Sequence, residues 1–385
     1  MCVTPPIVLT SFLAEDVMLS KHVKSLSEHL SELEPFRAPA LPPRQAPTIY
    51  PSPALTGDPQ GNTLSTAQIK NWHHQGFCLV DDVWPNELMR QAVTELTATA
   101  LAPGMGQGKE FPSDLESLNE ITLHPRLLRV IAQLLNTDES GIRLQESECW
   151  AKTSAVGGPP ADGWPALSNS DQRIHMDYPN MYLTHPPQWE APESVELILY
   201  YSDVKTCGGP THIVPRQGPG DWAYQWPYAN MPGAGLHKFI NDRTTAERFL
   251  RNKDPELYEF RKRLYEREVA VGYSLGTALI YRHDLWHRGT PLTTEREVTR
   301  HIHSLSFRKA QSEYCTPWSS GLARALYGRG EAILTRASIP QRCVLGFPAP
   351  GHPYWNPDTI EAVKARYPGK MDMRPYEEAL SEKVS

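Results

Sequence analysis

Two kinds of hydrophobic pattern divide the chain into a helical part and a part rich in short strands. Helices are predicted at 65–76, 86–101 and 125–135, and Ser65 with Gln68 forms a capping box at the start of the first. From Ile142 onward, short alternating or apolar runs are separated by Gly and Pro clusters. The main predicted strands are 143–152, 195–202, 211–214, 277–281 and 301–307. This order predicts a mainly β fold with flanking helices and a double-stranded β-helix core, the cupin-like jelly roll.

The region 1–60 has a pattern of its own. Apolar residues recur there at a spacing of three or four: Leu19, Val23, Leu26, Leu30 and Leu33. This spacing predicts a helix over 8–33, which either packs on the main domain or pairs two copies of the chain as a homodimer. Eight prolines follow within 35–59 and predict an extended arm.

The predicted jelly-roll domain, 61–315, is interrupted by an unusual segment, 218–268. An aromatic cluster opens the segment: Trp222, Tyr224, Trp226 and Tyr228. A charged helix is predicted after it, over 245–268. An insertion of this size is either an ornament or a lid over the mouth of the jelly roll. We expect 316–385, with a helical piece at 357–366, to be a C-terminal extension that packs on the core.

Composition narrows the class of protein. Among 385 residues, 38 Lys and Arg face 44 Asp and Glu, so the net charge is −6 and a nucleic-acid partner is not expected. No apolar run approaches the length of a membrane span, and the first 20 residues do not resemble a secretory signal. The six cysteines show no paired spacing, which indicates reduced thiols and a cytoplasmic location.

The candidate chemistry lies in His175-Met-Asp177 and in His287, 110 residues after Asp177. In an extended segment, side chains two residues apart point the same way, so His175 and Asp177 can bind one metal ion together. A histidine from a distant strand then supplies the third ligand. Two imidazoles and one carboxylate leave positions open on the metal, an arrangement that suits Fe(II) with a cosubstrate and O₂.

A basic residue near this group could hold a dicarboxylate. Arg300 heads a predicted strand thirteen residues after His287, so it can point inward and grip a carboxylate with two hydrogen bonds. Arg296 is the alternative, although it lies in the loop-like sequence Thr293-Thr-Glu-Arg-Glu. Each arginine could instead form a surface salt bridge.

The chain resembles the phytanoyl-CoA dioxygenase family of Fe(II)/2-oxoglutarate oxygenases over roughly residues 63–310. Four blocks in the expected order carry this resemblance: Leu64–Val83, His175-Met-Asp177, Cys207–Pro215, and His287-Arg-Gly-Thr-Pro followed by Arg300. The resemblance implies that His175, Asp177 and His287 bind Fe(II), with 2-oxoglutarate and O₂ as cosubstrates. It also implies hydroxylation of an unactivated C–H bond of a small molecule, with release of succinate and CO₂.

Two further cosubstrate contacts follow from the resemblance. Lys152 lies where some relatives direct a basic side chain at the cosubstrate. The family often has a hydroxyl residue two places after the distal histidine, but this chain has Gly289 there, so Thr290 would replace it. The spacing from His287 to Arg300 is also two residues longer than the eleven that family members often have, which keeps Arg296 as the alternative.

Substrate contacts are expected from the residues after the metal motif and from the insertion. Tyr178 follows the motif directly, and Trp222 and Trp226 suit an apolar or ring-containing molecule if they face the iron. Desaturation and ring formation are other outcomes in this family. The alternative function is a jelly roll that binds metal without oxidative turnover, as an isomerase, a sensor or an interaction scaffold.

Overall fold

The computed structural model describes residues 46–51, 64–99, 101, 108–111, 113–154, 169, 171–178, 182–184, 191–218, 220–225, 240–294, 297–312, 334–337, 339, 342 and 347–384. The predicted helix over 8–33 and most of the proline-rich arm lie outside these residues. Residues 46–51 of the arm are described, and they contribute a short strand to the fold.

The described elements follow the predicted order of helices first and strands afterwards. The strands are β1 (Thr48–Ile49), β2 (Phe77–Val80), β3 (Lys109–Glu110), β4 (Ile142–Thr153), β5 (Ser194–Tyr200), β6 (Thr211–Ile213), β7 (Val269–Val271), β8 (Ala278–Tyr281), β9 (His287–Gly289) and β10 (Thr299–Lys309). The helices are α2 (Thr66–Gln75), α3 (Asn86–Thr99), α4 (Glu116–Thr122), α5 (Pro125–Leu134), α7 (Val204–Cys207), α8 (Arg243–Lys253), α9 (Pro255–Arg267), α13 (Pro357–Arg366) and α14 (Arg374–Val384). Short 3₁₀ turns span Glu139–Gly141 and Trp222–Tyr224.

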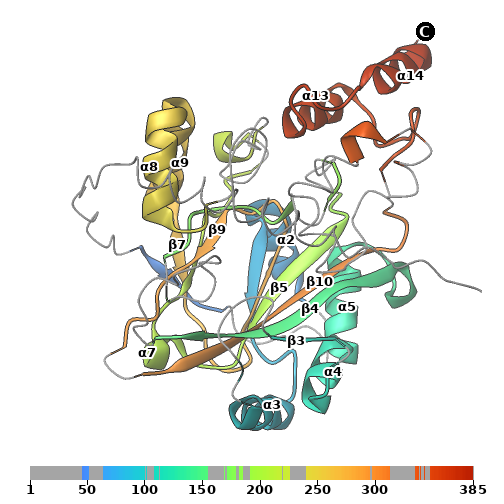
Figure 1. The fold of residues 1–385 in the computed structure, drawn as a ribbon. Coiled ribbons are helices and arrows are strands. Elements are labelled where there is room, and N and C mark those ends of the chain that lie inside the picture. Colours follow the sequence, from blue (N-terminus) through green and yellow to red (C-terminus); the bar gives the residue numbers. More distant parts are fainter. Residues whose placement is uncertain are drawn as a thin grey trace, which may run out of the picture. The chain divides into compact units, whose positions relative to one another are not determined.

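The strands form two sheets, which confirms the predicted jelly-roll class (Figure 1). The large sheet has the order β2-β8-β5-β10-β4-β3, and the small sheet has the order β1-β7-β6-β9. Neighbouring strands are antiparallel except β1 and β7, which are parallel. Trp150 and Ile198 of the large sheet share one buried cluster with Ile213 and Val271 of the small sheet. The two sheets therefore enclose a common interior.

Helices α2 to α5 cover the outer face of the large sheet. Leu127 and Ile131 of α5 are fully buried and belong to one cluster with Leu197 of β5 and Leu305 of β10. The capping box predicted at Ser65 and Gln68 is present at the start of α2. This helical layer excludes water from one side of the sheet and leaves its other face to the interior.

The helical part of the insertion differs from the prediction, because one expected helix is two. Asp254 separates α8 from α9, and its carboxylate accepts a hydrogen bond from the Leu257 amide while Pro255 begins α9. Aspartate before proline is a typical helix start, so the break follows from local chemistry. The two helices run side by side next to β7 and β9 (Figure 1).

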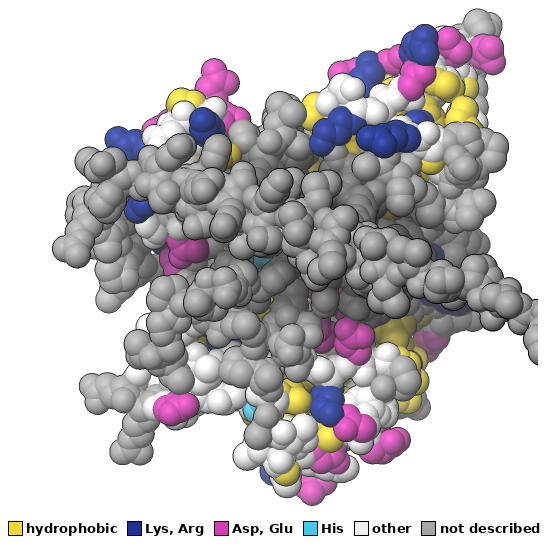
Figure 2. Space-filling model, viewed as in Figure 1, with side chains coloured by type: hydrophobic (Ala, Val, Ile, Leu, Met, Phe, Trp, Pro, Cys, Tyr) yellow, Lys and Arg dark blue, Asp and Glu magenta, His cyan; other side chains and the backbone are white. Residues whose placement is uncertain are grey.

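Helices α13 and α14 carry charges of both signs on the face drawn in Figure 2. Lys364 of α13 joins them, because its Nζ lies 2.9 Å from Glu361 and also contacts Glu377 of α14. From α13, Arg366 donates to the Thr184 carbonyl at 2.7 Å and the Tyr367 hydroxyl to the Leu183 carbonyl at 2.8 Å. Every helix in the described part of the chain is too short or too polar to cross a bilayer.

Candidate functional site

The three predicted metal ligands meet at the edge of the small sheet. His287 begins β9, and the segment that carries His175 and Asp177 lies beside it. The amide of each histidine donates to the carbonyl of the other, at 2.9 and 2.8 Å. One ligand atom from each of His175, Asp177 and His287 lies within 4.8 Å of the other two. The structure thus brings together residues that are 110 positions apart in the sequence.

Local hydrogen bonds fix the tautomer of both imidazoles. Nδ1 of His175 lies 3.0 Å from the Arg173 carbonyl, and Nδ1 of His287 lies 3.0 Å from the Leu285 carbonyl. A carbonyl oxygen only accepts, so each Nδ1 must carry the proton. Each Nε2 can then offer a lone pair to a metal ion, that of His287 in exchange for its 3.0 Å contact with Asp177.

The electrostatics around Asp177 fit a bound cation. Its carboxylate lies 3.0 Å from His287 Nε2 and 3.6 Å from His175 Nε2. Burial opposes ionisation of Asp177, but the histidines outweigh it and hold its pKa well below the usual range. Burial lowers the pKa of His175 to about 3, whereas Asp177 overcomes burial and raises the pKa of His287. Two nitrogen lone pairs and one carboxylate converge here, which is a donor set for a divalent metal.

Tyr281, which the sequence analysis did not single out, supports the ligand group. Its hydroxyl donates to Asp177 Oδ2 at 3.1 Å. Tyr281 lies opposite Glu196 in the sheet, Glu196 lies opposite Ser306, and Ser306 lies opposite Glu146. These four side chains form a row across the interior face of the large sheet. Strand alternation alone could have placed Tyr281 on this face, but its partner lies on a segment 104 residues away.

Arg300 lies at the other end of the same interior face. It is 2% exposed, and its guanidinium donates to the Gly209 carbonyl and to the Tyr273 hydroxyl, the latter at 3.3 Å. Its Nε is buried and has no hydrogen-bond partner among the described residues. An unpaired buried guanidinium N–H is costly, so this atom is suited to an anionic ligand. The Tyr200 hydroxyl donates to nearby Thr211, whose own proton stays available.

Lys152 and Thr290 accompany Arg300. Lys152 is the strand partner of Arg300, is buried, and donates from Nζ to the Thr290 carbonyl at 2.8 Å. The Thr290 hydroxyl donates its one proton to the Pro210 carbonyl at 2.6 Å, so it must turn away from Pro210 before it can donate to a carboxylate. Burial and the charge of Arg300 lower the pKa of Lys152 to about 7. The alternative arginine, Arg296, lies outside the described residues.

The predicted substrate residues are placed in different surroundings. Tyr178 is buried, its amide donates to the His283 carbonyl at 2.9 Å, and Arg366 of α13 lies 5.8 Å from its ring. Trp222 packs edge-on against Phe260, at 5.4 Å between ring centres. Two α9 guanidinium groups also lie over Trp222: those of Arg263 and Arg267, at 4.3 and 5.3 Å. Trp226 lies outside the described residues.

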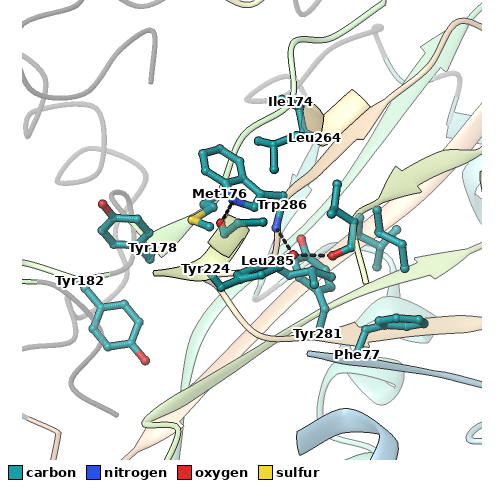
Figure 3. Packing of buried hydrophobic residues seen from close by; sticks show 14 of the residues in the cluster. Phe77, Ile174, Met176, Tyr178, Tyr182, Tyr224, Leu264, Tyr281, Leu285 and Trp286 are labelled. Atoms are coloured by element: carbon teal, nitrogen blue, oxygen red, sulfur yellow. Dashed lines mark hydrogen bonds between the residues drawn. The ribbon is translucent and has the colours of Figure 1, made fainter. Parts of the chain in front are cut away.

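Figure 3 shows part of the buried cluster near Tyr178, in which Trp286 and Met176 lie close together. The Trp286 indole donates to the Ala223 carbonyl at 2.7 Å. Because Met176 and Trp286 alternate with His175, Asp177 and His287 along the chain, they face away from the side that these three residues share. The described contacts of Trp222 are thus with the α9 side of the sheet.

No family model matches the chain, and no curated protein matches it. In fold it is similar to apo HygX from Streptomyces hygroscopicus, with 16% identity, a TM-score of 0.43, and coverage of 67% of this chain and 90% of HygX. It is also similar to SnoK, a non-heme alpha ketoglutarate dependent carbocyclase from nogalamycin biosynthesis, with 15% identity, a TM-score of 0.45, and coverage of 74% and 93%. HygX itself has been crystallised with iron and with nickel and 2-oxoglutarate.

Proposed function

We propose that the protein is a non-haem Fe(II)- and 2-oxoglutarate-dependent oxygenase that hydroxylates an unactivated C–H bond of a small molecule. One observation carries this proposal. A group of two imidazoles and one carboxylate, with both Nε2 atoms directed at the carboxylate, shares an interior with a buried arginine whose Nε lacks a partner in the described structure. Membership of the phytanoyl-CoA dioxygenase family is part of the same proposal.

One group of residues would bind the metal and another would bind the cosubstrate. His175, Asp177 and His287 would hold Fe(II), while Arg300, Lys152 and Thr290 would hold the far end of 2-oxoglutarate. Bound iron would supply the oxidation chemistry, in which 2-oxoglutarate and O₂ give succinate, CO₂ and a hydroxylated product. Tyr281 holds Asp177 in place, and the enclosed interior limits access of water.

The interior polarity would also orient the cosubstrate. Lys152 and Glu148 lie four residues apart on β4, about 13 Å at the usual rise of a strand. Glu146 and Glu196 lie beyond Glu148, in the row that contains Tyr281. Burial raises the pKa of Glu146 to about 8 and that of Glu196 well above its usual range, so these carboxyls are largely uncharged near pH 7 and offer a dicarboxylate no counter-charge. The cationic Arg300 end attracts it instead. This polarity favours one direction of binding, with the distal carboxylate at Arg300.

The remaining features of the proposal concern substrate and partners. We propose a small-molecule substrate contacted by Tyr178, Trp222 and Trp226, and no nucleic-acid or membrane partner. A cytoplasmic location and a homodimer formed through 8–33 complete the proposal. We also propose that the chain divides into an N-terminal region 1–60, a jelly-roll domain 61–315 and a C-terminal extension 316–385.

Anaerobic titration of metal-free protein with Fe(II) and then 2-oxoglutarate tests this function. The expected result is a visible metal-to-ligand charge-transfer band, because the keto acid would chelate the iron. Succinate should then form when O₂ is admitted. Tight metal binding without the band would contradict the proposal and favour a metal-binding jelly roll without oxidative turnover.

The lowered pKa of Lys152, about 7, predicts a pH dependence of cosubstrate binding. A bound dianion favours the charged amine, so 2-oxoglutarate binding should take up a proton above pH 7. Affinity should therefore weaken by up to about tenfold per pH unit above pH 7, until the pKa of the complex is reached. The charged groups that act on Lys152 are Arg300, Asp171 and Arg288.

Affinities measured from pH 6 to 9 at saturating Fe(II) check this expectation. Lys152→Met should bind more weakly at pH 6 and show a flat profile. Lys205→Met, at an exposed lysine, should keep the wild-type profile. Equal slopes in wild type and Lys152→Met would show that Lys152 does not contact the cosubstrate.

A further inference from the structure

The segment that carries His175 meets β9 at an isolated bridge, and its hydrogen bonds show a one-residue offset of the β-bulge kind opposite Arg288. Next to the paired His175 and His287, the amide of Gln172 donates to the Gly289 carbonyl at 3.0 Å. Three steps along one strand, from 172 to 175, therefore match two steps along β9, from 289 to 287. The extra residue places both Arg173 and Ile174 opposite Arg288. Such bulges commonly re-aim a side chain beside a functional site.

A bulge leaves backbone groups without their sheet partners, and α9 supplies replacements. The Ile174 amide donates to the Tyr265 hydroxyl at 3.0 Å, and the Ile174 carbonyl accepts from the Arg261 guanidinium at 2.9 Å. Both side chains are buried, and Arg261 is 0% exposed. Buried backbone groups must be paired to avoid a large desolvation cost. Arg261 and Tyr265 therefore stabilise the bulge from outside the sheet.

Glu247 of α8 fixes the direction of these hydrogen bonds. The Tyr265 hydroxyl donates to Glu247 Oε1 at 2.8 Å, and Arg261 Nε donates to the same oxygen at 2.9 Å. Since a phenol has one proton, the Tyr265 oxygen is left to accept from Ile174. Arg243 also lies over the Tyr265 ring, with its guanidinium carbon 4.3 Å from the ring centre. The hydroxyl is thereby held in one place.

The peptide unit between Arg173 and Ile174 connects the Tyr265 hydroxyl to the proposed metal site. Its N–H is held by Tyr265, and its C=O accepts from Nδ1 of His175 at 3.0 Å. Because a peptide unit is planar, fixing its N–H also fixes the direction of its carbonyl. The carbonyl in turn keeps the His175 proton on Nδ1 and the lone pair on Nε2.

We propose that Tyr265 is a positioning residue for the metal site, acting through the Arg173–Ile174 peptide on the orientation and tautomer of His175. The insertion helices α8 and α9 thus serve as a support behind the ligand strands. The proposal rests on the metal-binding function proposed above. His287 is an internal reference, because its Nδ1 bonds to the Leu285 carbonyl instead.

The test compares wild type with Tyr265→Phe, which keeps the ring and removes the hydroxyl. Tyr258→Phe is the matched control, since Tyr258 lies on the same helix and its hydroxyl makes no hydrogen bond within the described structure. Histidine ¹⁵N NMR of metal-free protein should show an Nδ1–H tautomer for His175 in wild type and in Tyr258→Phe. In Tyr265→Phe the His175 signals should shift toward a tautomer mixture, whereas those of His287 stay unchanged.

Metal affinity provides the second readout. Competition between protein and a chelating dye for Ni(II) should show a loss of about 10- to 100-fold in Tyr265→Phe, typical of a lost outer hydrogen bond. Unchanged His175 signals and an unchanged Ni(II) affinity would overturn the proposal while leaving the metal function intact. If wild type fails to bind Ni(II) and Fe(II), the proposed function is wrong, and the NMR comparison still decides the role of Tyr265.

Discussion

Replacing His287 with alanine is expected to abolish Fe(II) binding at micromolar metal. The substitution removes one of three protein ligands and leaves Asp177 without the imidazole 3.0 Å away. Loss of a mere outer partner costs about 10- to 100-fold in metal affinity, so loss of a ligand should exceed about 1,000-fold. Equilibrium dialysis with Fe(II) under anaerobic conditions measures the effect directly. The charge-transfer band with 2-oxoglutarate should vanish as well.

The control for this experiment is His74→Ala, which removes an exposed imidazole from α2. It should bind Fe(II) as wild type does. Thermal unfolding of the metal-free proteins separates a ligand effect from a folding defect, because His287→Ala should remain folded without metal. Near-normal Fe(II) affinity in a folded His287→Ala protein would show that the three residues do not form the metal site.

The ligand set illustrates what the sequence could predict. Strand alternation places His175 and Asp177 on one side, and the structure has Met176 on the other side, packed in a buried cluster. Alternation could not predict that His287 lies beside His175, because that contact depends on pairing across 110 residues or more. The resemblance to a known family supplied the pairing instead.

The role of the insertion could not be predicted from local patterns. The charged pattern predicts one helix over 245–268, although the Asp254-Pro255 start of α9 is a recognisable helix break. The partners of Tyr265 and Arg261 are backbone atoms 91 and 87 residues away, exposed by a bulge that no hydrophobic period encodes. A charged helix therefore gave no signal of its contact with the His175 strand.

Composition alone could not predict whether the aromatic cluster of the insertion binds a substrate or packs against the protein. Trp222 and its neighbours could equally line a pocket or pack against a helix. The structure places the ring of Trp222 against Phe260 and beneath two arginines of α9. Arginine stacking on tryptophan is favourable on its own, so these contacts need no ligand. The lid hypothesis for 218–268 stays a prediction, and 226–239 lie outside the described residues.

Replacing Arg300 with leucine is expected to weaken 2-oxoglutarate binding by at least about 100-fold, with Fe(II) affinity unchanged. Hydrogen bonds to charged groups contribute about 1.5–3 kcal/mol each, and two of them would be lost from a buried site. At 1.4 kcal/mol for each factor of ten, the loss is at least two orders of magnitude. Titration of the Fe(II)-loaded protein, followed by the charge-transfer band, measures it.

Two further variants and a second keto acid make this experiment specific. Arg308→Leu, on the same strand but eight residues further along, should leave binding unchanged. Arg296→Leu tests the other candidate, and a large loss there with little effect at Arg300 would reverse the assignment. Pyruvate has the chelating end of 2-oxoglutarate but lacks the distal carboxylate. Wild type should therefore prefer 2-oxoglutarate strongly, and Arg300→Leu should lose most of that preference, because Arg300 acts only on the carboxylate that pyruvate lacks.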